Sequence, residues 1–236
     1  MASFAELFVK IRSLVQLLVL IAAPGVAQAQ NKGVVYAGAA AGDGEGGFIG
    51  GLVALPGNSL GDGLAVRGGV NGGTYRYRTN ERIEATYISA EVALVYQFSG
   101  NWGWANVAAG PRVTDISLDP DDPSNKLRGT RFDAGVQTDG ALGNRWQTSW
   151  FGTWGIRNES YIGQLRLTRL LNEGSQTRVG LEGIVQGDPT YTRGSLGGHV
   201  ATALGGGWLG QFSAGASEQA GRKARPYAAL GISRLF

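Results

Sequence analysis

The sequence predicts an all-β protein: one antiparallel, closed barrel of about twelve strands, of the outer-membrane type, after a cleavable signal peptide. Three observations lead to this prediction. Segments of alternating apolar and polar residues recur along the chain, clusters of Gly, Asn, Asp and Pro separate them, and an apolar leader precedes them. Glycine accounts for 40 of 236 residues, against about 7% in ordinary proteins. Such a composition suits strands that bend, twist and pack closely.

The leader, residues 1–29, has the organisation of a signal peptide. Lys10 and Arg12 precede an apolar run over 14–23, and Ala27-Gln28-Ala29 ends the segment. These are the basic region, the apolar core and the small-residue cleavage site of exported proteins. The apolar run is too short for a membrane-spanning helix, which needs about 20 residues. We therefore expect the leader to be removed.

The charge and the cysteine content exclude several classes of protein. The chain has 21 Lys and Arg against 18 Asp and Glu, a formal net charge of +3, and no run of basic residues. A nucleic-acid partner is therefore not expected, because it would require a clustered basic surface. Cysteine is absent, so disulfides and thiolate metal sites contribute nothing to the fold.

Residues 30–236 are predicted to form a single β-barrel domain. Side chains of a strand alternate between its faces, which gives each segment one apolar and one polar side. In 145–156, for example, Trp146, Trp150 and Trp154 share one face and polar residues occupy most of the other. The predicted strands span residues 33–41, 47–55, 63–78, 83–98, 101–115, 128–140, 145–156, 160–170, 175–186, 191–204, 207–218 and 225–236.

Three features favour a membrane barrel over a soluble sheet. Tight turns, such as 99–101 and 143–144, alternate with longer links, such as 116–127 and 219–224, which is typical of outer-membrane barrels. The even number of strands places both chain ends at the same rim. The last strand ends in Phe236, which resembles the signal recognised by the machinery that assembles outer-membrane barrels.

A barrel in lipid must be closed, because no water is present to pair an open sheet edge. The first strand, 33–41, is therefore expected to pair with the last, 225–236. A soluble periplasmic barrel or sandwich with an ordinary core is the alternative, so the predicted location is the outer membrane and the alternative is the periplasm. Aromatic residues near the strand ends are expected to form interfacial girdles: Tyr96, Trp146, Trp154, Tyr161 and Trp208.

No catalytic, cofactor or metal site is predicted, and we expect the protein not to be an enzyme. His199 is the only histidine, and Ser195 on the same face lies about 13 Å along the strand. That separation is too large for the Ser–His pair of a lipid hydrolase, although a serine on a neighbouring strand stays open. The acidic segment 119–125 is predicted to be a turn, because Asp-Pro sequences form turns and no calcium-loop spacing is present.

Charged residues on the polar faces are expected to form a network of ion pairs in the barrel interior. Long Arg, Gln and Glu side chains that point inward would fill much of the lumen, so a wide polysaccharide conduit is not expected. The residues assigned to this network are Glu91, Asp133, Asp139 and Glu182, with Arg131, Arg145, Arg166 and Arg178.

Four segments carry a resemblance to a known family. They are 118–130 (Leu-Asp-Pro-Asp-Asp-Pro-Ser-Asn-Lys-Leu-Arg-Gly-Thr), 47–57 (Gly-Phe-Ile-Gly-Gly-Leu-Val-Ala-Leu-Pro-Gly), 72–77 (Gly-Gly-Thr-Tyr-Arg-Tyr) and the Gly-Pro pair at 110–111. Together they resemble the cellulose biosynthesis protein BcsS family, most clearly over 34–130. The resemblance implies an accessory protein of cellulose production in the Gram-negative envelope, and it supplies no catalytic residues.

The resulting hypothesis is a non-enzymatic outer-membrane accessory protein of cellulose biosynthesis and secretion. Its expected partners are outer-membrane lipid and cellulose or other components of cellulose export, without cofactors. Trp102 and Trp104, at the start of a strand, are candidate glucan contacts, with interfacial anchoring as the favoured alternative. The alternative functions are a general outer-membrane pore, a soluble periplasmic carbohydrate-binding β-protein and a lipid-modifying barrel enzyme.

Overall fold

The computed structural model describes residues 31–236 except 43, 175 and 221. The predicted leader, 1–29, lies outside the described residues. Residues Asn31–Phe236 form one compact unit. No helix in the described part of the chain is long and apolar enough to cross a membrane. The strands are β1 (Gly33–Ala41), β2 (Gly46–Ala54), β3 (Gly63–Arg78), β4 (Arg82–Gly100), β5 (Gly103–Asp119), β6 (Gly129–Leu142), β7 (Trp146–Gly155), β8 (Tyr161–Asn172), β9 (Thr177–Asp188), β10 (Tyr191–Gly205), β11 (Trp208–Gln219) and β12 (Arg225–Leu235).

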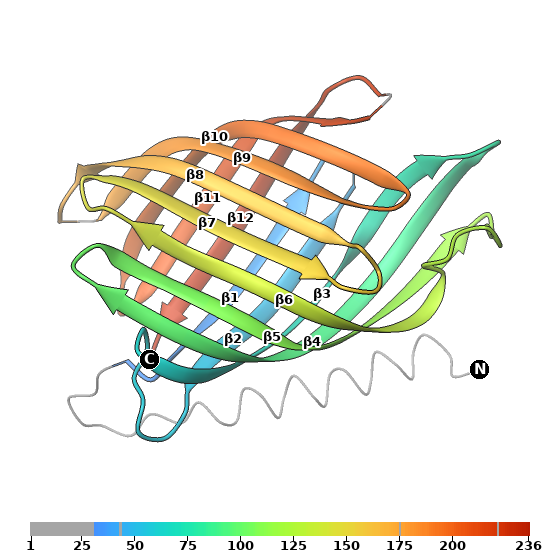
Figure 1. Cartoon of the computed structure of the whole chain (residues 1–236). Helices are drawn as coiled ribbons and strands as arrows, with labels where there is room; N and C mark the ends of the chain where they lie inside the picture. Colours follow the sequence, from blue (N-terminus) through green and yellow to red (C-terminus); the bar gives the residue numbers. More distant parts are fainter. Residues whose placement is uncertain (1–30, 43, 175, 221) are drawn as a thin grey trace. The chain divides into compact units, whose positions relative to one another are not determined.

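The strands form one closed antiparallel barrel in which each strand pairs with its neighbours in sequence (Figure 1). β1 closes the ring against β12, with a register that runs from Val34 opposite Leu235 to Ala41 opposite Ala228. The predicted closed antiparallel barrel, the strand number and the pairing of the first strand with the last are confirmed. Since every strand has two partners, the sheet has no open edge.

The barrel wall reverses the burial pattern of a water-soluble protein. Large apolar side chains at outward positions are exposed, among them Phe132 at 71%, Leu196 at 68% and Leu181 at 63%. Polar side chains at inward positions, including Arg67 and Glu182, are buried. A contiguous exposed apolar surface of this kind indicates contact with lipid or with another protein.

The connections divide between two rims. The rim that holds Asn31 and Phe236 is called the terminal rim, and the opposite one the far rim. Tight turns are found at the terminal rim, as predicted, but 189–190 at the far rim is equally short, and 55–62 at the terminal rim is long. The terminal-rim connections are 55–62, 101–102, 143–145, 173–176 and 206–207, and the far-rim connections are 42–45, 79–81, 120–128, 156–160, 189–190 and 220–224.

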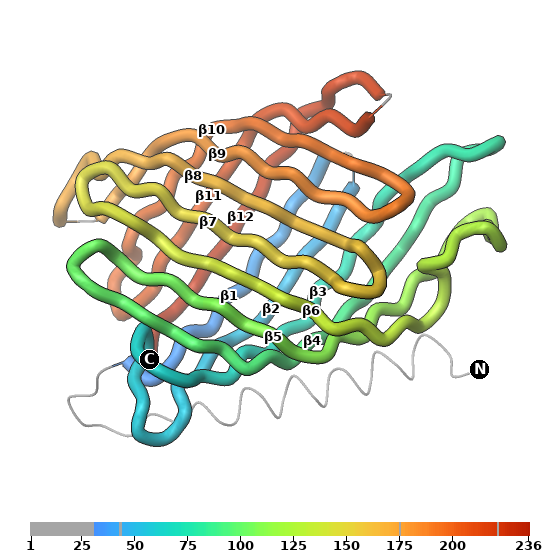
Figure 2. Tube along the Cα trace, viewed as in Figure 1, coloured from blue at the N-terminus to red at the C-terminus, as the bar shows by residue number. Residues whose placement is uncertain are grey.

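The strands β3 to β6 extend beyond the rest of the wall at the far rim. Figure 2 shows the β3–β4 hairpin, in teal, reaching past the other turns. β3 pairs with β4 as far as Arg78, whereas its pairing with β2 ends at Gly73. The predicted link 116–127 was therefore wrong at its start, because β5 continues to Asp119 in register with β4. Ile116 turns inward there and packs in an apolar cluster, which stabilises the longer strand.

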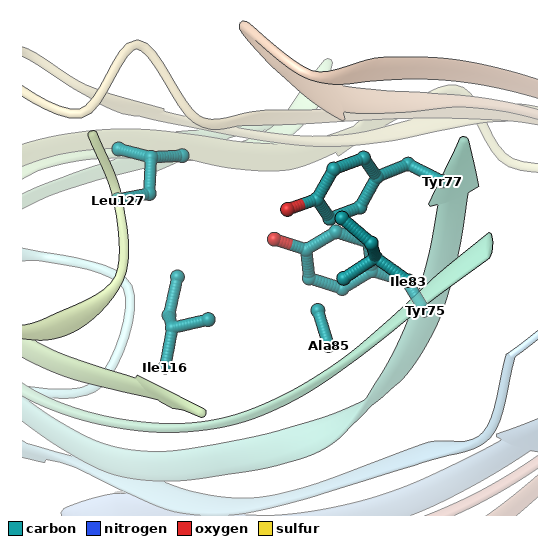
Figure 3. Close-up of a cluster of buried hydrophobic side chains, with 6 residues drawn as sticks. All are labelled: Tyr75, Tyr77, Ile83, Ala85, Ile116 and Leu127. Carbon is teal, nitrogen blue, oxygen red and sulfur yellow. The ribbon is translucent and has the colours of Figure 1, made fainter. Parts of the chain in front are cut away.

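Two apolar clusters lie inside the barrel, one near each rim. Figure 3 shows the first, called the far-rim cluster, which consists of Tyr75, Tyr77, Ile83, Ala85, Ile116 and Leu127. The second, called the terminal-rim cluster, consists of Leu52, Ala65, Ala93, Val95 and Ala108. Leu60 of the 55–62 link packs against the terminal-rim cluster. Between the two clusters the interior holds buried polar side chains, among them Ser89 and Asp133.

Candidate functional site in the barrel lumen

The wall from β3 to β7 carries a first polar network. Arg67 donates a hydrogen bond of 2.7 Å to the Gln137 carboxamide oxygen and pairs with the Asp139 carboxylate. Arg112 pairs with Glu91 through bonds of 2.9 and 2.7 Å, and Gln137 also donates to Glu91. Each carboxylate thus has a guanidinium partner, so the network neutralises its own charge.

A second network, called the Glu182 network, joins β8, β9, β11 and β12. Glu182 is 1% exposed. Its carboxylate accepts hydrogen bonds from Arg166 Nε at 2.6 Å, Gln164 Nε2 at 2.9 Å and the Tyr227 hydroxyl at 3.2 Å. Arg166 also donates to Gln211 at 3.1 Å. A buried carboxylate satisfied in this way is a structural ion pair, as the sequence predicted for Glu182 and Arg166.

His199 has a serine partner on the neighbouring strand. Its Nδ1 lies 2.9 Å from Ser213 Oγ on β11, and the same nitrogen lies 3.8 Å from Glu182 Oε2. In a catalytic triad the serine and the carboxylate contact opposite nitrogens of the imidazole. Ser213 is also only 2% exposed, so this arrangement does not present an activated nucleophile. Ser195, the serine on the His199 face, instead bonds Ser217 at 2.9 Å.

Replacement of His199 by Ala should leave the lipid composition of the host membrane unchanged. The imidazole shares one nitrogen between Ser213 and Glu182, a geometry without a proton relay. The measurement is mass spectrometry of extracted lipids from strains that carry the wild-type and the His199→Ala proteins. A loss of a deacylated lipid species in the variant strain would show that the pair is catalytic.

A cavity of about 780 Å³ lies along the inner wall from β7 to β11. On each of β8 to β11, three consecutive residues line the cavity, and the middle one points inward. On β7 the cavity is lined by Phe151, which also points inward. The central residues are Gln164, Ile184, Ser195 and Ser217. The lumen is therefore not uniformly filled: its polar networks leave one substantial space.

Contacts between non-adjacent strands cross the far mouth of the lumen. The rings of Tyr75 on β3 and Tyr191 on β10 stack with centroids 4.8 Å apart. Gln219 on β11 donates a hydrogen bond of 3.0 Å to the Arg76 carbonyl on β3. β3 and β10 are not neighbours in the ring, so these contacts cross the lumen. We call this arrangement, with Tyr77, the tyrosine cap.

The acidic 119–125 segment supports the cap, as a turn. Tyr77 donates to Asp122 at 2.9 Å and accepts from the Asn125 side chain at 2.8 Å. Asp122 also accepts hydrogen bonds from the Ser124 backbone N–H at 3.0 Å and the Ser124 hydroxyl at 2.6 Å. The bond from the backbone N–H is the local side-chain-to-backbone bond of an Asx turn. Among the described residues, no group of three or more His, Cys, Asp or Glu could hold a metal ion.

The 120–128 link should loosen in acid because of Asp122. Hydrogen bonds from Ser124 and then from Tyr77 hold the pKa of the Asp122 carboxyl below its ordinary value. The stabilisation is therefore complete above the pKa of the unfolded chain, about 4, and is lost as the pH falls through the lower folded value. Hydrogen exchange of the link between pH 6 and pH 3 measures this loss.

Two substitutions distinguish the effect of Asp122 on hydrogen exchange from that of its acidic neighbour, Asp121. Asp122→Asn should abolish the acid-induced rise in hydrogen exchange. Asp121→Asn, which alters only an exposed ion pair with Arg128, should retain it. Equal pH profiles in wild type and Asp122→Asn would contradict the assignment.

The two candidate glucan contacts lie at the terminal rim. Trp102 is in the β4–β5 turn and its ring lies 6.1 Å from that of Phe98, which in turn lies 6.2 Å from Tyr96. Tyr96 and Phe98 are exposed, so Trp102 extends an aromatic patch on the rim. Trp104 pairs with Ser99 on β4 and Ala141 on β6, on the inward face. Neither tryptophan lines the 780 Å³ cavity.

The comparisons with known proteins agree with this architecture. The model of the family described as cellulose biosynthesis protein BcsS matches residues 34–236. The chain belongs to this family. The resemblance noted in the sequence is thereby confirmed, and it extends over the whole barrel. No curated protein matches the sequence.

Solved structures similar to this BcsS-family chain are outer-membrane barrels. An outer membrane channel from Pseudomonas putida has a TM-score of 0.51 at 16% identity, covering 90% of this chain and 100% of the other. The translocator domain of the autotransporter NalP from Neisseria meningitidis has a TM-score of 0.50 at 11% identity, covering 98% and 96%. The KdgM porin has a TM-score of 0.46 at 8% identity, covering 86% and 99%. The first two likenesses, with TM-scores of 0.51 and 0.50, show that the BcsS-family chain shares the fold of these barrels.

Sequence reasoning placed Glu182 and Arg166 of the BcsS-family barrel on polar faces but missed two luminal features. Ser213 was not paired with His199, and Phe151 was not recognised as part of a cavity. The signal for both was present, because each residue occupies an inward position of a predicted strand. The register between strands, which brings Ser213 opposite His199, was the missing information.

Proposed function

We propose that the protein is a non-enzymatic outer-membrane protein that assists the secretion or cell-surface assembly of cellulose. The observation that carries the proposal is the inside-out wall of a barrel that belongs to a cellulose biosynthesis family. Side chains such as Leu181 and Leu196 need lipid around them, while buried ion pairs such as Arg166–Glu182 need a protected interior. Outer-membrane lipid is then one partner, and cellulose or another component of its export is the second.

The absence of enzymatic activity is part of this proposal. The Glu182 carboxylate accepts hydrogen bonds from Arg166, Gln164 and Tyr227. These bonds leave it no role as a general base. His199 and Ser213 share one buried contact without relay geometry. These contacts support a structural role for the luminal polar groups.

The proposal includes export of the protein and roles for the two tryptophans of the terminal rim. Residues 1–29 act as a signal peptide that is removed before the barrel of residues 30–236 assembles. Trp102 anchors the terminal rim at the membrane interface through its contact with Phe98. Trp104, at an inward position of the same rim, is the better placed of the two tryptophans to contact a glucan.

A deletion strain tests the proposed function. Cellulose output should fall and should return when the wild-type gene is supplied, and the protein should be found in the outer-membrane fraction. Its band should migrate differently in unboiled and boiled samples, as folded barrels do. Normal cellulose output in the deletion strain would contradict the proposal, and recovery of all the protein as a soluble periplasmic species would contradict its membrane location.

A general diffusion pore is the second candidate, and the luminal cavity is the observation that favours it. The tyrosine cap opposes it, because Tyr75 and Tyr191 cross the far mouth. Solute uptake separates the two functions: a deletion strain with unchanged cellulose output and slower uptake of small solutes would establish the pore.

A further inference from the structure

The luminal cavity along β7 to β11 has the size of a ligand site. Its volume of about 780 Å³ falls within the roughly 300–1,000 Å³ of small-molecule pockets. Apart from Ala224 of the 220–224 link, its lining lies on strands, and five neighbouring strands supply inward residues at matching depth. Gln164 is opposite Phe151, and Ser195 is opposite both Ile184 and Ser217.

The inward side chains of the cavity lining are neutral. Phe151 and Ile184 supply apolar contact area, while Gln164, Ser195 and Ser217 supply a carboxamide and two hydroxyls. Glu218 also borders the cavity, but it lies at an outward position of β11, opposite Gly194. A ligand with a formal charge would find no opposite charge among these inward side chains.

Three ionised residues occupy inward positions beside this lining: Glu182, Arg193 and Arg225. Glu182 is held by Arg166 at 2.6 Å, and Gln164 and Tyr227 donate to the same carboxylate. Because Glu182 is engaged by these bonds and the inward side chains of the lining are neutral, a charged ligand would be desolvated without a direct charge partner in the lining. A purely apolar chain is disfavoured as well, since it would offer no partner to the Gln164 carboxamide oxygen or to the hydrogen-bonding capacity that Ser195 and Ser217 retain beyond their mutual bond.

A neutral sugar chain matches both the apolar contact area and the uncharged hydrogen-bonding groups of this lining. Its ring faces of C–H groups pack on an aromatic ring such as Phe151, and its hydroxyls exchange hydrogen bonds with hydroxyl and carboxamide side chains. We propose that this cavity binds a short segment of neutral, β-linked glucan. The inference rests on the proposed function for the choice of glucan and assigns the contact to β7–β11 rather than to the tryptophans of the terminal rim.

Calorimetric titration of the full-length protein, extracted from outer membranes into detergent, tests the assignment with cellohexaose as the probe. Saturable binding is expected for cellohexaose and weaker binding for maltohexaose, which has the same composition but α linkages. Ser195→Leu, which fills the cavity, and Phe151→Ala, which removes its aromatic ring, should each weaken binding about tenfold or more. Phe212→Ala, at an outward position of β11 that does not line the cavity, is the matched control and should bind as wild type does.

The outcomes that overturn the assignment are distinct. A folded wild-type barrel that takes up no cellohexaose, or a Ser195→Leu variant with undiminished binding, removes the cavity as a glucan site. Equal binding of maltohexaose removes the preference for a β linkage. Heat-modifiable mobility verifies that each variant is folded, and Phe151→Ala carries the test if Ser195→Leu does not fold.

The deletion strain keeps this inference separate from the proposed function. Reduced cellulose output together with a barrel that binds no glucan would overturn the cavity assignment alone. Normal cellulose output together with cavity-dependent binding of cellohexaose would overturn the proposed function alone.

Discussion

Replacement of Glu182 by Ala should destabilise the barrel by about 3–5 kcal/mol. The carboxylate is 1% exposed and is the common acceptor for Arg166, Gln164 and Tyr227. Its removal would leave the Arg166 guanidinium inside the barrel without an opposite charge. The measurement is urea-induced unfolding of the detergent-folded protein, followed by tryptophan fluorescence.

A second Arg–Glu pair provides the control for this substitution. Glu84 pairs with Arg76 at 2.7 Å on the exposed part of the β3–β4 hairpin, with 34% and 45% of the Arg and Glu side chains exposed. Because surface pairs are screened by water, Glu84→Ala should cost at most about 1 kcal/mol. Equal losses of stability in the two variants would mean that Glu182 is not the centre of a protected interior network.

Introduction of a charge at Leu181 should destabilise the barrel in a bilayer by about 2–4 kcal/mol. Leu181 lies next to Glu182 in sequence but on the opposite face of β9, and it is 63% exposed. In Leu181→Arg the guanidinium would enter the apolar part of the membrane. The measurement is reversible unfolding of the protein inserted into phospholipid vesicles.

The same substitution discriminates between the two proposed locations. In a water-soluble periplasmic barrel an exposed Arg at this position would change stability by less than about 0.5 kcal/mol. Leu181→Ala, which shortens the side chain without adding charge, is the control for lost packing. A neutral effect of Leu181→Arg, equal to that of the Ala variant, would refute a lipid-facing wall.

The strands and their faces could be predicted because they depend on local information. The alternation around Trp146, Trp150 and Trp154 has the two-residue period that a strand imposes, so β7 and its outward face follow from sequence alone. The turns follow from the same residues, since Gly-Asn and Gly-Gly pairs interrupt the alternation. The largest error in a strand end is that of β5, because Ile116 continues the strand beyond the predicted turn.

The candidate site could be predicted only in part, because it depends on contacts across the barrel. Polar faces indicated ion pairs in the interior, and Arg166–Glu182 is one of them. The contact of His199 with Ser213 requires the register of β10 on β11. The stacking of Tyr75 on Tyr191 requires the diameter and curvature of the closed ring. Neither the register between neighbouring strands nor the curvature of the closed ring can be derived from a single sequence.

The pairing of β1 with β12 has a consequence for how the protein reaches its native state. Val34 and Leu235 are among the most distant positions in the chain, yet they face each other in the finished ring. Bringing such remote segments together carries a large loop-closure cost in entropy, and topologies with distant contacts fold slowly. The seam is therefore expected to form late, after the hairpins. A nascent chain that has not yet joined its ends exposes two unsatisfied edges, which would favour aggregation unless a chaperone or assembly factor shields them.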